Sequence, residues 1–333
     1  MDPVSQGVFG SLWAQAGSRR TPLKQTLIAG WLGGMAPDLD VLIRSSSDPL
    51  LALDYHRHFT HSIAFAPIGG LVVALALWPL MKRKLGFAGL YLCCFLGYLS
   101  HGLLDAFTSY GTSLFLPFSD LRLALNWISV IDPLFTLPLL LLLGIALFTR
   151  QRAWLWGGAV WATLYLGAAG FQHARAVDAT RQWVHSRGIQ VERLVAKPSF
   201  ANIVLWRGLI DTGSHFQTLA IRLIPGREPT ITVGERVPTF KPESVTADSK
   251  LRNDLKRFAH FSDDWLFRYP PAAEKGGEFI GDFRYAIDPA SARPLWGISF
   301  DPTDKTGMQF VRLRQVDKSA REQYWQRLMG NTP

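Results

Sequence analysis

The chain contains 333 residues, 48% of them hydrophobic, with a formal net charge of +9 and a sequence pI near 9.7. Its basic residues are dispersed and do not form a groove-like patch with interleaved aromatic side chains, which argues against nucleic acid as a partner. Its two cysteines, Cys93 and Cys94, are adjacent within an apolar run, which excludes a disulfide framework and a cysteine-based zinc ribbon.

The composition changes near residue 172. Residues 1–172 contain no glutamate and only a few aspartates, whereas residues 173–333 mix Lys, Arg, Asp and Glu throughout. A chain of this length accommodates two domains. We therefore expect one domain over residues 1–172 and a second over residues 173–333.

Five apolar segments follow one another in the first domain. Each is close to the ~20 residues that a helix needs to cross a bilayer. They lie at residues 26–43, 63–80, 85–104, 127–148 and 153–171. Glycines and Pro37 interrupt the first segment, so it is also compatible with a re-entrant helix. The pattern predicts an α-helical polytopic membrane domain of about five helices.

The connections between these segments predict an orientation through the positive-inside rule. Three basic clusters fall on one side of the predicted topology: Arg19, Arg20 and Lys24; Lys82, Arg83 and Lys84; Arg150 and Arg152. That side is expected to be cytoplasmic, together with the N-terminus, and the domain after residue 172 is expected to be extracytoplasmic.

The second domain changes period. Apolar runs at residues 200–206 and 216–224 predict strands, with Asp211-Thr212-Gly213 as a turn between them. Residues 247–267 place apolar side chains at helical spacing. We expect a small α+β domain, and the sequence does not indicate its protein partners.

Histidines and aspartates are grouped in the first domain. The groups are Asp38-x-Asp40, His56-x-His58-x-x-His61, His101-x-x-x-Asp105 and Asp132. In the predicted topology every one of them lies at the outer membrane face. Imidazole and carboxylate ligands without thiolates suit a divalent metal, most readily zinc, or manganese or iron if carboxylates dominate.

The spacing gives several of these residues alternative roles. His101 and Asp105 share a helix face, so both can bind one cation, or Asp105 can orient the imidazole. Asp38 and Asp40 are candidate ligands, or else polar residues at a helix end.

Three further residues are candidates for catalysis. Arg57 can clamp a phosphate or carboxylate group, although a solvated arginine fits equally. Asp132 precedes Pro133, so it is a ligand or general base, or a helix cap. His58 is a candidate proton donor.

Four ordered motifs within residues 1–148 carry a family resemblance. They are Gly34-x-x-Pro37-Asp38-x-Asp40, His56-Arg57-x-x-Thr60-His61-Ser62, Ser100-His101-x-x-Leu104-Asp105 and Ile131-Asp132-Pro133. The set resembles the YdjM-like family of LexA-binding, inner-membrane-associated, metal-dependent hydrolases. More distantly it resembles zinc-dependent phospholipase C and nuclease P1. The chain has Ser5-Gln6 where members of the family often carry Thr-His.

The resemblance implies a bacterial inner-membrane hydrolase, and the distant relatives favour a phosphoester. We therefore expect a metal-activated water to attack a phosphoester or lipid-like substrate that enters from the bilayer. The expected metal ligands are Asp38, Asp40, His56, His61, His101 and Asp105, and the expected catalytic residues are Arg57, His58 and Asp132. The alternatives are a transporter that passes cations or protons along His and Asp, and a metal-stabilised sensor or scaffold.

Overall fold

The chain divides into two compact units. The computed structural model describes residues 1–18, 21–245, 249–273, 277–301, 308–313 and 318–331. The first unit comprises Met1–Ile43, Tyr55–Phe171 and Phe200–Asn202. The second comprises Arg44–Asp54, Gln172–Ser199 and Ile203–Pro333. Residues 44–54 therefore belong to the second unit although both of their neighbours in sequence belong to the first.

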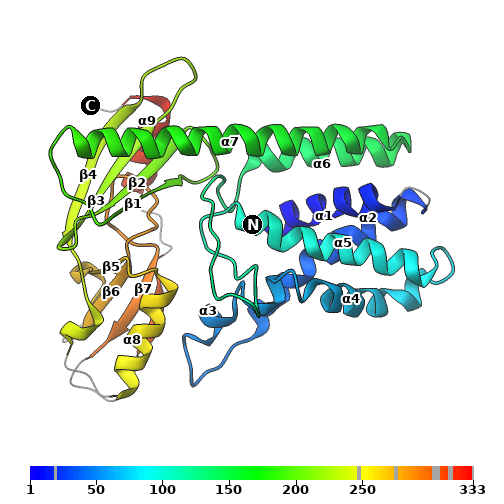
Figure 1. Ribbon diagram of the computed structural model, residues 1–333, viewed down its shortest axis with the longest axis horizontal. Helices are drawn as coiled ribbons and strands as arrows, with labels where there is room; N and C mark the ends of the chain where they lie inside the picture. The colour runs from blue at the N-terminus through cyan, green and yellow to red at the C-terminus, as the bar shows by residue number, and fades with distance from the viewer. Residues whose placement is uncertain (19–20, 246–248, 274–276, 302–307, 314–317, 332–333) are drawn as a thin grey trace. The chain divides into compact units, whose positions relative to one another are not determined.

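The first unit is helical (Figure 1). Its helices are α1 (Pro3–Gly17), α2 (Leu23–Met35), α4 (Ala66–Met81), α5 (Phe87–Ala106), α6 (Pro133–Thr149) and the first part of α7 (Ala153–His185). Two short 3-10 helices, η1 (Ala36–Leu42) and η2 (Phe59–His61), connect to them. Helices α1, α2 and α5 pack on one another, and α4 packs on α5.

Glycines allow α2 and α5 to approach closely. A Cβ atom at Gly97 of α5 would lie 2.3 Å from the carbonyl oxygen of Gly30 in α2. Small residues at a helix crossing let the two backbones come into contact. This contact brings η1, which follows α2 directly, close to the C-terminal part of α5.

The expectation of a polytopic, multi-pass domain is wrong. Within the described ranges, α5 is long and apolar enough to cross a membrane on its own. A second crossing exists only if Leu51–His61 and α4, which meet at a 90° bend, form one broken span. Half of the apolar window of α5 is buried inside the protein.

Local chemistry explains why four of the apolar segments do not give separate spans. The segment 26–43 changes from α2 to the 3-10 helix η1 at Ala36–Pro37, so α2 has only 13 residues. The segment 63–80 yields α4, with 16 residues. In the segment 127–148 the helix α6 begins only at Pro133 and has 17 residues. The segment 153–171 opens a 33-residue helix rich in tryptophan and glycine, which lower its hydropathy.

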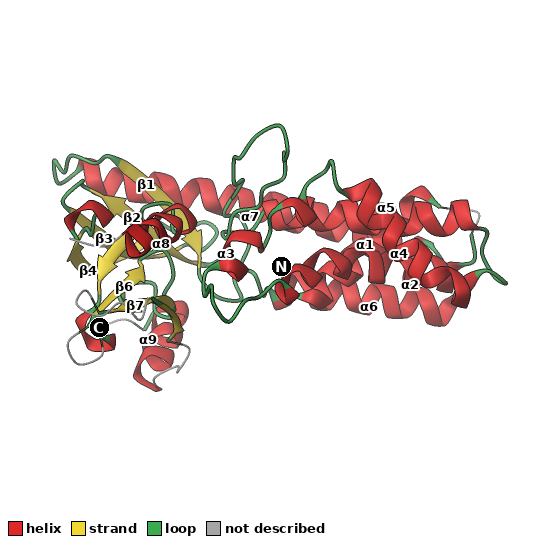
Figure 2. Cartoon of the chain, turned by 90° about the horizontal axis from the view of Figure 1, so that it is seen from below, coloured by secondary structure: helices red, strands yellow, loops and turns green. Residues whose placement is uncertain are grey.

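The second unit contains two four-stranded antiparallel sheets, drawn in yellow in Figure 2. The first has the order β1 (Arg193–Pro198), β2 (Leu205–Asp211), β3 (His215–Arg222) and β4 (Thr230–Pro238). The second has the order β5 (Leu266–Arg268), β6 (Glu278–Asp282), β7 (Trp296–Phe300) and β8 (Gln309–Arg312). The expected small α+β domain is thus corrected to a two-sheet antiparallel β domain.

Helices accompany the sheets of the second unit. They are α8 (Ser249–Phe261), α9 (Lys318–Met329), and the 3-10 helices η3 (Pro242–Ser244) and η4 (Pro270–Ala272). The second part of α7 packs Ala176, Ala179 and Trp183 against Trp206 of β2 and Ile221 of β3. A separate aromatic core, which includes Phe216, Trp265 and Phe283, stabilises the unit by burial of apolar surface.

Candidate metal centre

Three elements of the first unit bring four polar side chains together. Asp38 comes from η1 and His61 from η2, while His101 and Asp105 lie one turn apart on α5. His61, His101 and Asp105 are buried, and the side chain of Asp38 is 21% exposed. The four residues therefore form a buried cluster with one open edge, at Asp38.

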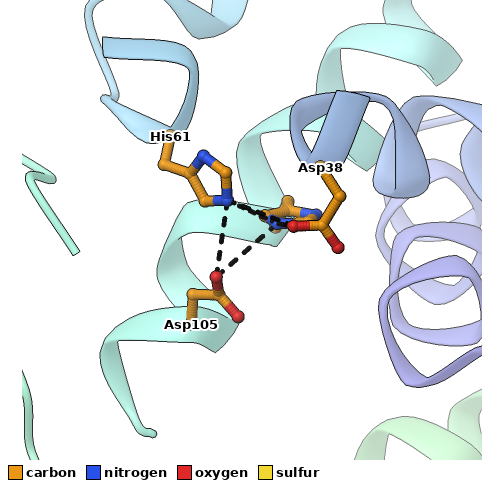
Figure 3. A group of neighbouring side chains, drawn as sticks. Asp38, His61 and Asp105 are labelled. Atoms are coloured by element: carbon orange, nitrogen blue, oxygen red, sulfur yellow. Dashed lines mark hydrogen bonds and ion pairs between the residues drawn. The ribbon is translucent and has the colours of Figure 1, made fainter. Parts of the chain in front are cut away.

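The ligand atoms of this cluster converge on one point (Figure 3). The Nε2 atoms of His61 and His101 lie 2.9 Å apart. Asp38 Oδ1 lies 3.5 Å and 3.4 Å from these two atoms, and Asp105 Oδ2 lies 3.5 Å and 3.6 Å from them. Ligands about 2.0–2.1 Å from a tetrahedral zinc ion are separated by about 3.3–3.4 Å. The carboxylate-to-imidazole distances are close to that value.

The opposite ring nitrogens of both histidines have hydrogen-bond acceptors. His101 Nδ1 lies 2.5 Å from the Gly34 carbonyl oxygen. His61 Nδ1 lies 3.0 Å from Thr60 Oγ1 and 3.4 Å from Asp40 Oδ2. If each Nδ1 carries the proton, both Nε2 lone pairs face each other and repel unless a cation lies between them. This donor set fits a divalent metal ion, so the cluster could hold one.

Asp40 contacts both His56 and His61. It is 3% exposed, and Asp38, Asp40 and His56 also have ligand atoms close enough to hold a cation. His56 Nδ1 donates to Asp40 Oδ1 at 2.9 Å, and the Arg57 backbone N–H donates to Asp40 Oδ2 at 2.9 Å. Asp40 therefore fixes the positions of His56 and His61.

Several donors hold the two carboxylate oxygens of Asp105. Arg57 Nε lies 3.0 Å from Asp105 Oδ2, and Arg57 Nη1 donates to Thr108 at 2.8 Å. Gln6 Nε2 donates to Asp105 Oδ1 at 2.7 Å, and the amino group of Met1 forms an ion pair with the same oxygen. The Arg57 guanidinium is buried and lies over the Tyr110 ring, so it faces the cluster and not bulk solvent.

The carboxylates of η1 are held in their charged form. Burial alone would raise the pKa of Asp38, but the facing imidazoles of His101 and His61 outweigh burial and keep that pKa well below its usual range. Burial likewise opposes ionisation of Asp40, and hydrogen bonding from His56 lowers its pKa. Both carboxylates are therefore available as anionic ligands near neutral pH.

The remaining two predicted site residues lie outside these groups. Asp132 is buried at the N-cap of α6, where its carboxylate accepts from the Phe135 backbone N–H at 3.3 Å and from Tyr165 Oη at 2.8 Å. Burial raises the pKa of Asp132. His58 packs its ring against Tyr55 and Phe59. Their catalytic roles stay predictions.

Sequence reasoning missed some partners of the site. His101 contacts the Gly34 carbonyl, and Arg57 lies over the Tyr110 ring. Asp132 accepts from the Tyr165 hydroxyl. Gly34 was part of a motif, but no pattern assigns a backbone carbonyl to a histidine elsewhere in the chain. Tyr165 is 33 residues from Asp132 and carries no sequence signal.

Comparisons with known proteins agree with the motifs. The profile of the family described as "YdjM inner membrane protein" matches residues 1–176. The uncharacterized protein YfhP of Bacillus subtilis (strain 168) is 24% identical over 268 residues, which cover 78% of this chain and 77% of YfhP. No solved structure matches. The chain belongs to the YdjM inner membrane protein family.

Proposed function

We propose that the protein is a metal-dependent hydrolase whose centre is formed by Asp38, His61, His101 and Asp105. One observation carries the proposal: two buried imidazoles face each other through Nε2 at 2.9 Å while acceptors lie at each Nδ1. Two carboxylates converge on the same point. Buried imidazole pairs need a cation or a shared proton at such a distance, and the two carboxylates complete a set of four donor atoms for a cation.

Zinc is the proposed metal. Two imidazole nitrogens and two carboxylate oxygens are ligands that zinc accepts. The four carboxylate-to-imidazole distances are close to the edges of a zinc tetrahedron, while the two imidazole nitrogens lie closer together, at 2.9 Å. When bound, the ion would supply Lewis-acid polarisation of a phosphoryl or acyl oxygen and would acidify a water molecule.

The side chains around the centre have positioning tasks. Asp40 holds His61 through Nδ1, and Arg57 and Gln6 hold the two oxygens of Asp105. The His56 side chain is 25% exposed, and its Nδ1 is bonded to Asp40. Nε2, on the opposite side of the His56 ring, is the proposed proton acceptor near the open edge.

We propose a lipid or lipid-linked phosphoester as the substrate. The resemblance to phospholipase C and nuclease P1 favours a phosphoester. The family is one of inner-membrane proteins, and α5 carries His101 and Asp105 near the end of its apolar run. If α5 crosses the membrane, its end lies near the membrane surface, where a substrate held in the leaflet can reach these residues.

We further propose that the centre lies on the outer side of the inner membrane. Lys82, Arg83 and Lys84 precede α5, and the positive-inside rule places them in the cytoplasm, so the other end of α5 lies outside. Arg152 donates to backbone carbonyls of Ser18 and Thr21, so a second basic connection lies near the start of α2. Arg19 and Arg20 lie outside the described residues. Residues 44–54 belong to the second unit and lie in sequence between Asp40 and His56, so the second unit is assigned to the same outer side.

The first test is the metal content of the full chain purified in mild detergent. After loading with Zn²⁺ and removal of free ion, elemental analysis should give about one ion per chain. Substitution His61→Ala or His101→Ala should markedly lower the number of zinc ions retained per chain, since each removes a ligand from a four-ligand set. His260→Ala, which changes an exposed histidine on α8, is the matched control and should retain the metal.

The second step is a hydrolysis assay of the zinc-loaded chain with bis(p-nitrophenyl) phosphate and with phospholipid vesicles. Hydrolysis that is lost in both histidine variants supports the enzyme. Zinc binding through these residues without hydrolysis of any phosphoester or ester would contradict the hydrolase proposal and favour a metal-stabilised scaffold. Absence of metal binding would contradict the proposed metal centre itself.

A further inference from the structure

A short segment links the metal centre to the second unit. Residues 44–54 lie between Asp40 and His56 in the sequence, and they group with the second unit. The helix α3 (Leu51–Tyr55) covers the end of this segment. His56 and Arg57 follow α3 directly in the sequence, so the position of α3 determines the backbone positions of these two residues.

Arg257 of α8 holds this segment. Its Nε donates to Asp54 Oδ2 at 2.9 Å, and its Nη2 donates to Asp48 Oδ2 at 2.9 Å and also to Asp54 Oδ2. Its Nη1 donates to Asp254 Oδ1, within α8, at 3.0 Å. One guanidinium thus joins three carboxylates, two of which belong to the segment before His56.

The network differs from an ordinary surface ion pair. The Arg257 side chain is 23% exposed, and those of Asp48 and Asp54 are 33% and 35% exposed. An isolated pair at such exposure contributes little, whereas a planar guanidinium that binds several carboxylates through separate N–H groups fixes their geometry. Asp48 also accepts from the Leu50 backbone N–H at 3.0 Å, so the same contact supports the start of α3.

The residues after α3 contact the centre directly. The Arg57 backbone N–H and His56 Nδ1 both donate to Asp40, which lies 3.4 Å from His61 Nδ1. The Arg57 side chain lies 3.0 Å from Asp105. A shift of α3 therefore changes the surroundings of two proposed ligands, His61 and Asp105.

We propose that Arg257 is a positioning residue for the metal centre, through which the second unit controls metal affinity. The inference rests on the proposed function, because it assigns control of that same centre. It gives the β domain a role: α8 fixes α3, and α3 fixes His56 and Arg57 against Asp40 and Asp105.

The test is metal affinity of the full chain in detergent, with Co²⁺ as a spectroscopic probe and Zn²⁺ in competition with a chromogenic chelator. Loss of a group that directly orients a ligand weakens metal binding by about 10- to 100-fold. Arg257 acts through α3, so Arg257→Gln should weaken metal binding by a smaller factor, roughly three- to tenfold. The Co²⁺ absorption spectrum should also change, and Arg257→Lys should restore part of both.

Two further variants separate positioning from folding. Lys256→Gln removes the same charge from the neighbouring position of α8 and should leave the affinity and the spectrum unchanged. Asp54→Asn removes one acceptor of Arg257, and the double variant with Arg257→Gln should be no weaker than Arg257→Gln alone. Additive losses in the double variant would contradict the proposed relay.

The outcomes distinguish this inference from the proposed function. If the parent chain binds Zn²⁺ and Arg257→Gln lowers thermal stability while its affinity and Co²⁺ spectrum equal those of the parent, Arg257 is only structural and the inference is overturned. If the parent chain binds neither ion, the proposed function itself fails.

Discussion

Gln6 stands where the family resemblance leads us to expect a histidine, and the structure gives it a definite contact. Its amide Nε2 donates to Asp105 Oδ1 at 2.7 Å, while Asp105 Oδ2 faces the two imidazoles. An amide in this position orients a carboxylate without adding a charge. Gln6 therefore supports the centre from behind Asp105.

Substitution Gln6→Met should weaken Zn²⁺ binding by about tenfold, because it preserves the shape of the side chain but removes the donor to Asp105. Chelator competition with the full chain measures the affinity. Gln15→Met, at another buried glutamine of α1, provides the control. Equal affinities for the parent and Gln6→Met would show that Asp105 needs no such donor.

Lys197, in strand β1, is a buried titratable group of the second unit. Burial first, and the nearby Arg284 second, lower the pKa of Lys197 to about 7, from the usual value of about 10.4. Between these two values the unfolded chain binds a proton at this position and the folded chain does not. The free energy of unfolding should therefore rise with pH, by up to ~1.4 kcal/mol per pH unit, and this contribution is lost as pH falls towards 7.

Denaturant unfolding at pH 7 and pH 9.5 checks this prediction. Lys197→Met should remove the pH-dependent gain, whereas Lys241→Met, at an exposed lysine of the same unit, should preserve it. Identical pH dependence in the parent and Lys197→Met would mean that Lys197 stays charged in the folded protein.

At the scale of helices, the α2–α5 crossing determines whether the ligands meet. Asp38 follows α2, and His101 and Asp105 lie on α5, so any separation of the two helices moves the ligands apart. The Cβ of Gly97→Ala would meet the Gly30 carbonyl at 2.3 Å, and a backbone oxygen cannot rotate away.

We expect Gly97→Ala to destabilise the protein by about 1–3 kcal/mol and to weaken Zn²⁺ binding as well. Thermal unfolding and chelator competition measure the two effects. The control is Gly144→Ala in α6, where an added Cβ meets no atom within 4 Å. Similar behaviour of the two variants would exclude a tight crossing.

The sequence predicts some of these elements and not others, for identifiable reasons. The spacing of His101 and Asp105 places them on one helix face, and the structure places them one turn apart on α5. Apolar length alone does not reveal that Ala36–Pro37 converts the end of the first apolar segment to a 3-10 helix. It also does not reveal that α6 begins only at Pro133, after its N-cap Asp132. The spans predicted over residues 26–43 and 127–148 were therefore wrong, whereas the one over 85–104 corresponds to α5.

For the whole molecule, the motifs identify the family correctly, because they lie within the residues that the family profile matches. The position of the Arg57 guanidinium was not predictable, because Arg57 precedes η2 and its partner Asp105 lies on α5, far away in the sequence. The arrangement of the second unit also depends on where the chain stops one sheet, after β4, and on the register of each strand pair, such as β6 with β7, which local periodicity does not specify.

The path of the chain between its units limits how this protein can be recombined. The chain leaves the first unit at residue 44, returns at 55, leaves again at 172, and contributes residues 200–202 once more. Neither unit is therefore an uninterrupted cassette. A chimaera that exchanges everything after residue 172 between relatives would keep its own residues 44–54 beside a foreign β domain. Insertion or loss of that domain in evolution would require matching changes in an eleven-residue segment far upstream.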